Sequence, residues 1–170
     1  MMAHETPPRQ GELRLLESQV AQHLLSSRIP ARCAYIASNG SPRIVATWFH
    51  WTGAELVMPT FISAPHVRHP AARIRDLRKN PQIAVSIDTD DFPPQVLTVR
   101  GAATVDEVDG VAPEYAEAAV RYLGQDQGTE YLAQIDQPIT RMARIAVRPA
   151  WVGVLDFSSR LPSALGGVTG

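Results

Sequence analysis

The amino-acid sequence predicts a mainly β (α+β) fold, an antiparallel barrel of six to seven strands with flanking helices. Three observations carry this prediction. Runs of alternating, β-branched and aromatic residues recur along the chain. Tight-turn residues join most of these runs, which is typical of antiparallel strands rather than βαβ units. Helical patterns occur only near the start, the middle and the late part of the chain, where helices would plug or flank a closed barrel without exposed edges.

The length and composition indicate one domain. The 170 residues suffice for one sizeable core, and 45% hydrophobic and 19% charged residues are typical of a globular protein. No internal repeat and no linker divides the chain. We expect a disordered N-terminus over residues 1–10, a single domain over 11–157 and a flexible C-terminal tail over 158–170.

The charge balance and the cysteine content restrict the partners and the compartment. A formal net charge of −1 gives no overall field that attracts nucleic acid or acidic membranes, although a local basic patch can still bind a phosphate. No apolar run is long enough to span a bilayer. Cys33 is the single cysteine, which excludes an internal disulfide and fits a reducing cytoplasm. We therefore expect a cytoplasmic protein that binds neither nucleic acid nor a membrane, with Cys33 as a small buried hydrophobic residue.

The first half of the chain predicts one helix and three strands. Apolar residues recur at helical spacing over Gly11–Ser26, and Pro30 prevents any continuation of the helix. Strands are expected over Arg32–Ser38, Arg43–Trp51 and Glu55–Pro59. Asn39-Gly40 predicts a type I′ hairpin between the first two strands, because both central residues of that turn need a positive φ. The three strands would form an antiparallel meander.

The second half predicts a loop, three helices and four strands. The loop covers Phe61–Pro70, which holds two prolines and two histidines. Helices are expected over Ala71–Lys79, Glu114–Leu123 and Glu130–Ile135, with Thr129 as the N-cap of the last helix. Strands are expected over Gln82–Ile87, Gln95–Val105, Arg141–Arg148 and Trp151–Leu155. Gly101, inside the longest strand, indicates a bulge or a close backbone approach.

A cationic helix carries the first candidate binding residues. Arg73 and Arg75 stand near the start of the expected helix, and the planar guanidinium group suits phosphate oxygens. The N-terminus of that helix would add free N–H groups and the positive end of its dipole. Thr60, at the end of the third expected strand, offers a hydroxyl to a phosphate or a ring edge. A solvated basic helix face explains the same pattern without a ligand, and this alternative stays open.

An aromatic run supplies the second candidate. Trp48–Trp51 can stack on the ring of a ligand, or it can fill a barrel interior and a subunit interface. His66 and His69 do not predict a metal site, because prolines place them in a loop and no carboxylate or cysteine cluster lies nearby in the sequence. The sequence contains no nucleophile with an obvious activating base and no glycine-rich phosphate-binding motif, so any catalysis would depend on a cofactor.

The order of these segments resembles that of the pyridoxamine 5′-phosphate oxidase-like split β-barrel family of flavin-binding proteins. The resemblance runs from about Arg32 to Leu155, and residues 40–49, 56–60, 72–86, 96–103 and 144–149 carry it. It implies an antiparallel six- to seven-stranded split β-barrel that forms a homodimer. The cofactor of such proteins, FMN or the related 8-hydroxy-5-deazaflavin coenzyme (coenzyme F-420), lies in a groove between the two subunits.

The resemblance also implies the cofactor-binding residues. Arg73 takes the position of the family's phosphate-binding lysine or arginine, and Thr60 would face the same phosphate. Ala46, Thr47 and Trp48 would lie along the isoalloxazine ring. Arg75 and Arg43 complete the expected set, which contains no metal ligand and no assigned catalytic residue.

The leading interpretation is an FMN-dependent oxidoreductase that transfers hydride between the flavin and an unidentified small-molecule substrate. A deazaflavin-dependent reductase is the first alternative, because Arg68, Arg73, Arg75, Arg78 and Lys79 could form a basic groove for the acidic tail of that coenzyme. A second alternative is a non-catalytic module that stores or carries a flavin or haem, with His50, His66 or His69 as a haem ligand. A dimeric barrel with a degenerate cofactor site is the third.

Overall fold

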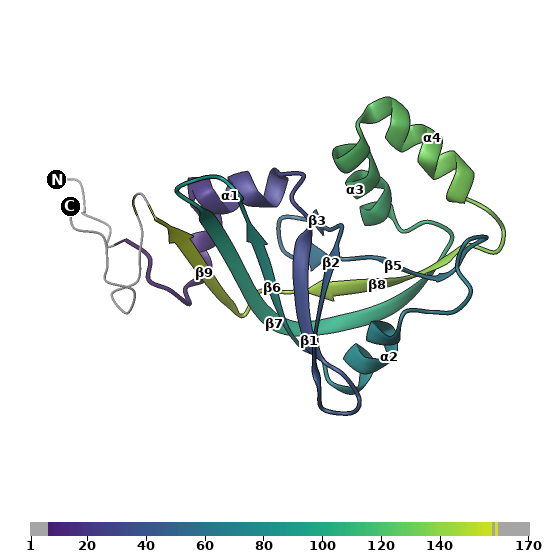
Figure 1. Cartoon of the computed structure of the whole chain (residues 1–170), viewed down its shortest axis with the longest axis horizontal. Helices are drawn as coiled ribbons and strands as arrows, with labels where there is room; N and C mark the ends of the chain where they lie inside the picture. The colour runs from purple at the N-terminus through teal and green to yellow at the C-terminus, as the bar shows by residue number, and fades with distance from the viewer. Residues whose placement is uncertain (1–6, 158, 160–170) are drawn as a thin grey trace.

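The computed structural model of the protein describes residues 7–157 and 159. Nine antiparallel strands form one sheet with the order β2-β1-β6-β7-β8-β4-β3, while β5 pairs with β8 and β9 pairs with β7 (Figure 1). The strands are β1 (Ala31–Ile36), β2 (Pro42–Thr47), β3 (His50–Trp51), β4 (Leu56–Val57), β5 (Thr60–Ser63), β6 (Gln82–Asp88), β7 (Gln95–Asp109), β8 (Arg141–Val147) and β9 (Trp151–Asp156). The helices are the 3₁₀-helix η1 (Leu13–Glu17) and the α-helices α1 (Gln19–Ser26), α2 (Ala72–Lys79), α3 (Pro113–Leu123) and α4 (Gln125–Ile135).

The sheet is not closed, so the expectation of a closed barrel was wrong. Among the described strands, β2 pairs with β1 alone and β3 pairs with β4 alone, and these two strands end the path of neighbours. The expected meander was also wrong, because the β1–β2 and β3–β4 hairpins lie at opposite ends of that path. Nine strands replace the expected six to seven, since three of them are shorter than five residues. The mainly antiparallel architecture with flanking helices is confirmed.

The expected strand over Arg43–Trp51 divides at Trp48–Phe49. Strand β2 ends at Thr47, and the next strand begins at His50. Phe49 is completely buried, because the chain leaves the first hairpin here and turns its ring into the core. A continuous alternation of side chains in the sequence gave no sign of this break.

Strand β7 connects the two halves of the sheet. Its 15 residues pair with β6 and β9 over the first half and with β8 over the second half. Gly101 lies between these halves in regular register with Ile83, so it forms no bulge. A Cβ atom at Gly101 would stand 2.6 Å from the carbonyl oxygen of Arg148, which confirms the close backbone approach predicted from the sequence.

Two local predictions fail because the backbone hydrogen bonds are satisfied in another way. The helix expected over Gly11–Ser26 is interrupted at Ser18, whose backbone is extended and whose hydroxyl accepts a hydrogen bond from the Ala21 N–H at 3.2 Å. The Asn39-Gly40 hairpin exists, but its turn is not type I′, because only Gly40 has a positive φ. The Gly40 N–H donates to the Ala37 carbonyl, which gives a three-residue hairpin loop.

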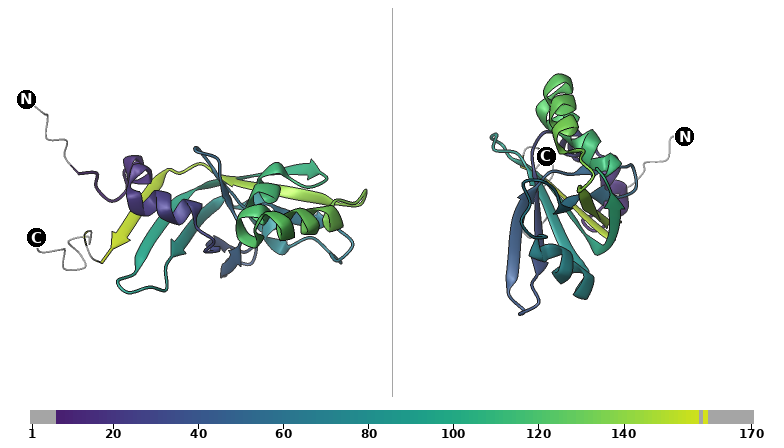
Figure 2. Two further views of the ribbon diagram at one scale, coloured as in Figure 1. Left: turned by 90° about the horizontal axis from the view of Figure 1, so that it is seen from above. Right: turned by 90° about the vertical axis from the view of Figure 1, so that its right-hand side faces the viewer.

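The late part of the chain forms a helical hairpin. Thr129 lies inside α4 and is not its N-cap, because that helix begins at Gln125, directly after Gly124 with its φ of +89°. A Cβ atom at Gly128 would stand 2.8 Å from the Cα of Val120, so glycine permits α3 and α4 to pack closely. The hairpin stands on one side of the β5–β8 region and α2 stands on the other (Figures 1 and 2).

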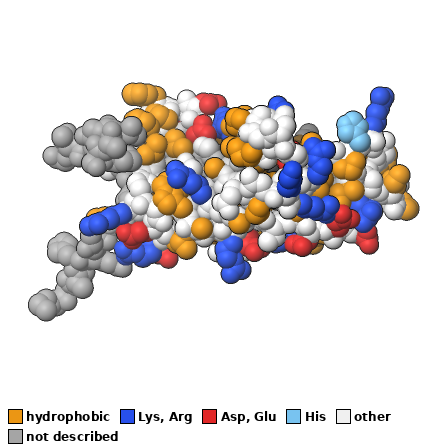
Figure 3. Space-filling model, turned by 90° about the horizontal axis from the view of Figure 1, so that it is seen from below, with side chains coloured by type: hydrophobic (Ala, Val, Ile, Leu, Met, Phe, Trp, Pro, Cys, Tyr) orange, Lys and Arg blue, Asp and Glu red, His pale blue; other side chains and the backbone are white. Residues whose placement is uncertain are grey.

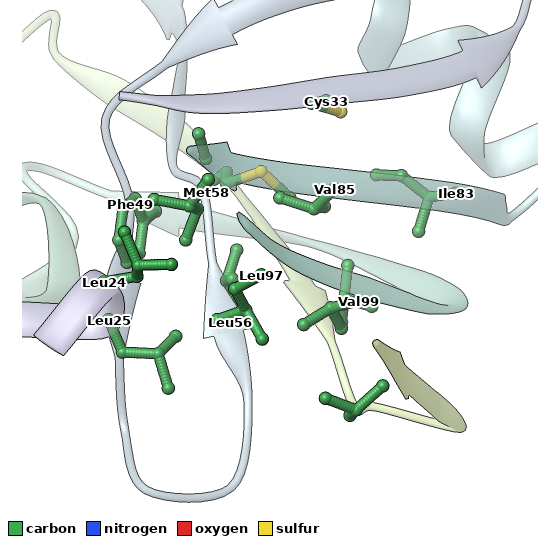
Figure 4. Close-up of a cluster of buried hydrophobic side chains, with 14 of the residues drawn as sticks. Leu24, Leu25, Cys33, Phe49, Leu56, Met58, Ile83, Val85, Leu97 and Val99 are labelled. Atoms are coloured by element: carbon green, nitrogen blue, oxygen red, sulfur yellow. The ribbon is translucent and has the colours of Figure 1, made fainter. Parts of the chain in front are cut away.

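The main core lies between the two halves of the sheet and α1. It contains branched aliphatic side chains with Phe49 and Met58, and Cys33 is part of it, as the sequence predicted (Figure 4). The chain before α1 also contacts the sheet: the Gln10 side chain donates to the Val154 carbonyl at 2.5 Å and accepts from its N–H at 2.9 Å. Of the expected disordered start over 1–10, residues 1–6 lie outside the described residues, as does the expected tail over 158–170 apart from residue 159.

The helices among the described residues lack the combination of length and hydropathy that a bilayer-spanning helix requires.

Gly101→Ala tests the close approach of β7 to the segment after β8. We expect a loss of about 1–3 kcal/mol in the free energy of unfolding, because the new methyl group meets backbone that cannot rotate away. Urea denaturation measures this change. Thr104→Ala, at an exposed position of the same strand, is the matched control and should change the value by less than about 0.5 kcal/mol. Equal effects of the two substitutions would contradict the prediction.

Candidate functional site

A cavity of about 760 Å³ opens between α2, the end of β2, β5 and the α3–α4 hairpin. Its walls combine aromatic, cationic and small residues, and no Asp or Glu of the described chain lines it. The lining residues used below are Ala46, Thr47, Trp48, Thr60, Phe61, His69, Ala71, Ala72, Arg73, Arg75, Tyr115 and Tyr131. Segments far apart in the sequence therefore meet around one space.

Arg73 and Thr60 form the polar end of the cavity. The Nε of Arg73 donates to the Thr60 Oγ1 at 3.0 Å, and its Nη2 donates to the same oxygen. Thr60 is buried and Arg73 is half-buried. Burial lowers the pKa of the Arg73 guanidinium. In the described structure no carboxylate pairs with this guanidinium, so its charge is not neutralised by the protein.

The N-terminus of α2 faces the same end. Ala71 precedes the helix with an extended backbone and offers no side-chain cap to the first turn. Helices leave their first N–H groups without intrahelical acceptors, and the helix dipole places partial positive charge there. Ala71 and Ala72 line the cavity beside Arg73, so the helix end and the guanidinium contribute positive potential at one place.

Aromatic rings form a further part of the cavity wall. The Trp48 indole stacks on Tyr122 with ring centroids 5.0 Å apart and an interplanar angle of 6°. It also meets Tyr115 at 5.8 Å and the edge of Tyr131 at 6.1 Å. Phe61 packs against Tyr115 in an edge-to-face arrangement at 5.2 Å. This cluster gives a broad apolar surface of the kind that binds planar rings.

Two hydroxyl groups lie among these rings. The Oη atoms of Tyr115 and Tyr131 are 2.9 Å apart and hydrogen-bonded to each other. Burial, and then the hydrogen bond to Tyr131, strongly raises the pKa of the Tyr115 hydroxyl. Tyr115 is therefore neutral at physiological pH and acts there as a hydrogen-bond donor or acceptor, not as an anion.

Salt bridges fix α3 against the sheet. The Nε of Arg144 on β8 lies 2.7 Å from the Glu114 carboxylate at the start of α3, and its Nη2 lies 3.0 Å from the Glu55 carboxylate. All three side chains are partly buried, so these ion pairs are stronger than exposed ones. They keep Tyr115, the residue after Glu114, over the cavity.

Six of the seven residues expected from the sequence line this cavity: Ala46, Thr47, Trp48, Thr60, Arg73 and Arg75. Arg43 does not. It lies in a smaller hollow of about 310 Å³ that it shares with Arg75 and Asp76. Arg43 stands opposite Tyr35 in the β1–β2 hairpin, several residues from the end of β2 where the cavity begins.

Arg75 is more exposed than Arg73 and its charge is already paired. Its Nη2 lies 3.1 Å from the Asp76 carboxylate, and its own side chain is 73% exposed. The hydrogen bond from the Ser38 hydroxyl, with those from Arg75, holds the pKa of Asp76 below its usual range. Arg75 therefore offers a weaker anion site than Arg73.

Sequence reasoning missed Phe61, Tyr115 and Tyr131. Phe61 was assigned to a loop, but it belongs to β5, which pairs with β8. Tyr115 and Tyr131 lie on different helices, and only the α3–α4 hairpin brings their hydroxyl groups together. The one available signal was the apolar face of the expected helix over Glu114–Leu123, which does not show what that face covers.

The three histidines considered as haem ligands do not gather. Only His69 lines the cavity. His66 packs edge-to-face on Phe61 at 5.0 Å, and His50 belongs to β3. Within the described residues, no group of three or more His, Cys, Asp or Glu side chains is placed to hold a metal ion.

Basic side chains gather on the outer face of α2. Figure 3 shows Lys and Arg side chains concentrated toward the half of the molecule that contains this helix, with acidic side chains among them. Arg75, Arg78 and Lys79 are exposed residues of α2. Arg78 is paired with Glu107 at 2.8 Å, so part of this charge is locally compensated.

Solved structures resemble this chain in fold. An F420 reductase is 26% identical, with 76% of this chain and 93% of that chain covered and a TM-score of 0.57. General stress protein 26 from Bacillus anthracis is 13% identical, with 85% and 95% covered and a TM-score of 0.58. A pyridoxamine 5′-phosphate oxidase-related, FMN-binding protein from Nostoc punctiforme is 13% identical, with 78% and 76% covered and a TM-score of 0.53.

These neighbours confirm the resemblance to the pyridoxamine 5′-phosphate oxidase-like proteins, and the open sheet agrees with their split-barrel fold. The two structures at 13% identity show the fold alone. No family model and no curated protein matches the sequence significantly.

Cys33 is close enough to Arg73 for the two groups to interact electrostatically. The reactivity of its thiol therefore reports how well this region excludes water. Burial raises the pKa of its thiol to about 11, against the opposing effect of the Arg73 charge. We expect a disulfide reagent at pH 8 to label Cys33 about 100-fold more slowly in the folded protein than in urea, because the thiolate is the reactive form. Absorbance of the released thiol measures both rates.

The same shift gives a pH dependence of stability. The folded-state pKa of Cys33 lies above the ordinary value of 9.0. The contribution of the protonated thiol to the free energy of unfolding is therefore complete below pH 9 and is lost as the pH rises toward 11. Cys33→Ala removes this slope and serves as the control. Rapid labelling of Cys33 in the folded protein would contradict the predicted shift of its pKa.

Proposed function

We propose that this chain binds a phosphorylated flavin-type cofactor and transfers hydride between its ring and a small molecule. One observation carries the proposal: the half-buried, unneutralised Arg73 guanidinium lies in the same cavity as an aromatic wall. FMN is the simplest ligand that combines a phosphate with a planar redox ring.

The polar end of the cavity suits a phosphate. A half-buried cation without an acidic partner carries a desolvation cost that a bound anion offsets. Thr60 accepts both hydrogen bonds from Arg73, so its own hydroxyl hydrogen remains available for a ligand oxygen. The absence of Asp and Glu from the described lining leaves no charge that would repel the phosphate.

The aromatic end suits the ring. The cavity volume falls in the range of small-molecule sites, which is about 300–1,000 Å³. Trp48, Tyr115 and Phe61 supply apolar surface, and Ala46 and Thr47 add small residues through which backbone groups can reach a ring edge. An aromatic surface and a cationic group in one cavity support the binding of a planar, anionic ligand.

The protein's own groups hold and shield the reactants. The cofactor, when bound, supplies the hydride chemistry. Arg73 and Thr60 would fix its phosphate, and Trp48 with Tyr115 would exclude water from its ring. The Tyr115 hydroxyl stays protonated, so it can hold a proton near the reacting atoms.

A deazaflavin coenzyme is the second candidate. The 26% identity to an F420 reductase favours it, since the other solved structures named above are only 13% identical. Arg75, an exposed cation of α2 that lines the cavity beside Arg73, suits a longer anionic ligand. Titration of the purified protein with FMN and with the deazaflavin coenzyme separates the candidates, and turnover with the preferred, reduced cofactor distinguishes an enzyme from a carrier.

Arg73→Ala tests the phosphate end. We expect cofactor binding to weaken by about 1.5–3 kcal/mol, the range for a hydrogen bond to a charged group. Quenching of cofactor fluorescence measures the Kd. Arg78→Ala is the matched control, because Arg78 lies on the same helix, does not line the cavity and pairs with Glu107. An unchanged affinity in Arg73→Ala would show that this helix does not bind the phosphate.

We also propose that the protein is a homodimer through the free edge of β2. Among the described strands it pairs with β1 alone, it ends at the cavity, and its Ile44 is 70% exposed. An unpaired edge with exposed apolar side chains favours association with another chain. A second copy placed there would lie beside Ala46 and Thr47 and would narrow the cavity.

Ile44→Lys tests this interface. Sedimentation velocity should report a dimer for the parent protein and about a tenfold or greater weakening of association for the variant, because a charge then occupies the apolar contact. Phe92→Lys is the control, since Phe92 is equally apolar and 96% exposed but lies away from β2 in the β6–β7 turn. A parent protein that stays monomeric at micromolar concentration overturns the proposal.

A further inference from the structure

Arg121 of α3 joins three segments that support the aromatic wall of the cavity. Its Nη1 donates to the Leu25 carbonyl at the end of α1 at 2.8 Å, and its Nη2 donates to the Phe49 carbonyl in the break between β2 and β3. The guanidinium carbon stands 4.4 Å from the centre of the Phe49 ring and 4.9 Å from that of Tyr122. One side chain thus connects α1, α3 and the residue that follows Trp48.

The surroundings of Arg121 are costly for a charge. In the described part of the chain its guanidinium contacts two neutral carbonyl groups and two aromatic rings, and its Nε is buried without a hydrogen-bond partner. Burial lowers the pKa of this guanidinium. An apolar side chain would fill this place without the desolvation cost. Arg121 therefore differs from an apolar side chain at this place through its hydrogen bonds and its contacts with the rings.

Those contacts converge on Trp48. Arg121 fixes the carbonyl of Phe49, the next residue in the chain, and lies over the ring of Tyr122, on which the Trp48 indole stacks. The Tyr122 hydroxyl is itself held, since it donates to the Ile29 carbonyl at 3.1 Å. Neither Arg121 nor Tyr122 lines the cavity, whereas Trp48, which Tyr122 stacks against and which precedes Phe49, does.

We infer that Arg121 is a positioning residue that fixes the Trp48 indole as the ring-binding wall of the cavity. The inference rests on the proposed function for the identity of the ligand. It predicts that ring binding and phosphate binding can be weakened separately, because Arg121 supports Trp48 whereas Arg73 and Thr60 form the polar end.

Two probes separate these ends: lumiflavin, a flavin ring without a phosphate, and inorganic phosphate. We expect Arg121→Met to weaken lumiflavin binding about tenfold and to change phosphate binding by less than about twofold. Arg121→Lys should recover part of the lumiflavin affinity, because an ammonium group keeps the charge and can reach one of the carbonyl groups. Arg141→Met, at an exposed arginine paired with Glu107, is the control and should leave both affinities unchanged.

A measurement without ligand makes the test independent of the proposed function. The near-ultraviolet circular dichroism difference between the parent and Trp48→Phe defines the Trp48 signal, and Arg121→Met should lose most of it while its far-ultraviolet spectrum stays unchanged. An unchanged Trp48 signal, or equal loss of lumiflavin and phosphate binding, overturns the inference. A parent that binds no lumiflavin overturns the proposed function, and the Trp48 signal then still decides the role of Arg121. If Arg121→Met does not fold, Arg121→Lys provides the same comparison.

Discussion

The length of β7 is the constraint on which the rest of the structure depends. The two halves of this 15-residue strand pair with different strands, so β7 joins the two parts of the sheet. Gly101 lies where the partners change, and no side chain stands there between β7 and the Arg148 carbonyl. Among the described strands, β2 and β3 end the path of neighbours, so the sheet stays open. The cavity lies between α2 and the α3–α4 hairpin.

The sequence predicts well those features that depend on neighbouring residues. The basic helix α2, the long strand through Gly101 and the buried Cys33 all follow from local pattern and composition. Predictions fail where a distant contact decides. The break after Thr47 exists because Phe49 is drawn into the core, and no residue near it in the sequence marks the change. Closure of the sheet depends on which edge strands pair with each other, and the hydrophobic periodicity of the sequence carries no information on this pairing.

The site shows the same division. Arg73 and Thr60 were identifiable, because a cationic helix start and a strand-terminal threonine are local features that suit a phosphate. The opposite wall was not, since Tyr115 and Tyr131 meet only after α3 and α4 fold together. Arg43 completed the set that the resemblance implied, but the structure places it in a smaller hollow, opposite Tyr35 in the β1–β2 hairpin. A local charge pattern is visible in the sequence, whereas an aromatic wall built from separate helices is not.

Arg121 and Arg73 both have a guanidinium group that is partly removed from water, and they differ in the groups that contact it. The contacts of Arg121 are supplied by the chain itself, through two carbonyl groups and two aromatic rings, so its charge serves the internal order of the fold. The Arg73 guanidinium donates to one neutral hydroxyl, that of Thr60, and lies beside an open cavity. No Asp or Glu of the described chain lines this cavity. Desolvation is unfavourable for both groups, and for Arg121 the carbonyl groups and rings of the fold offset part of it. An anionic ligand bound beside Arg73 can offset the desolvation cost of its guanidinium.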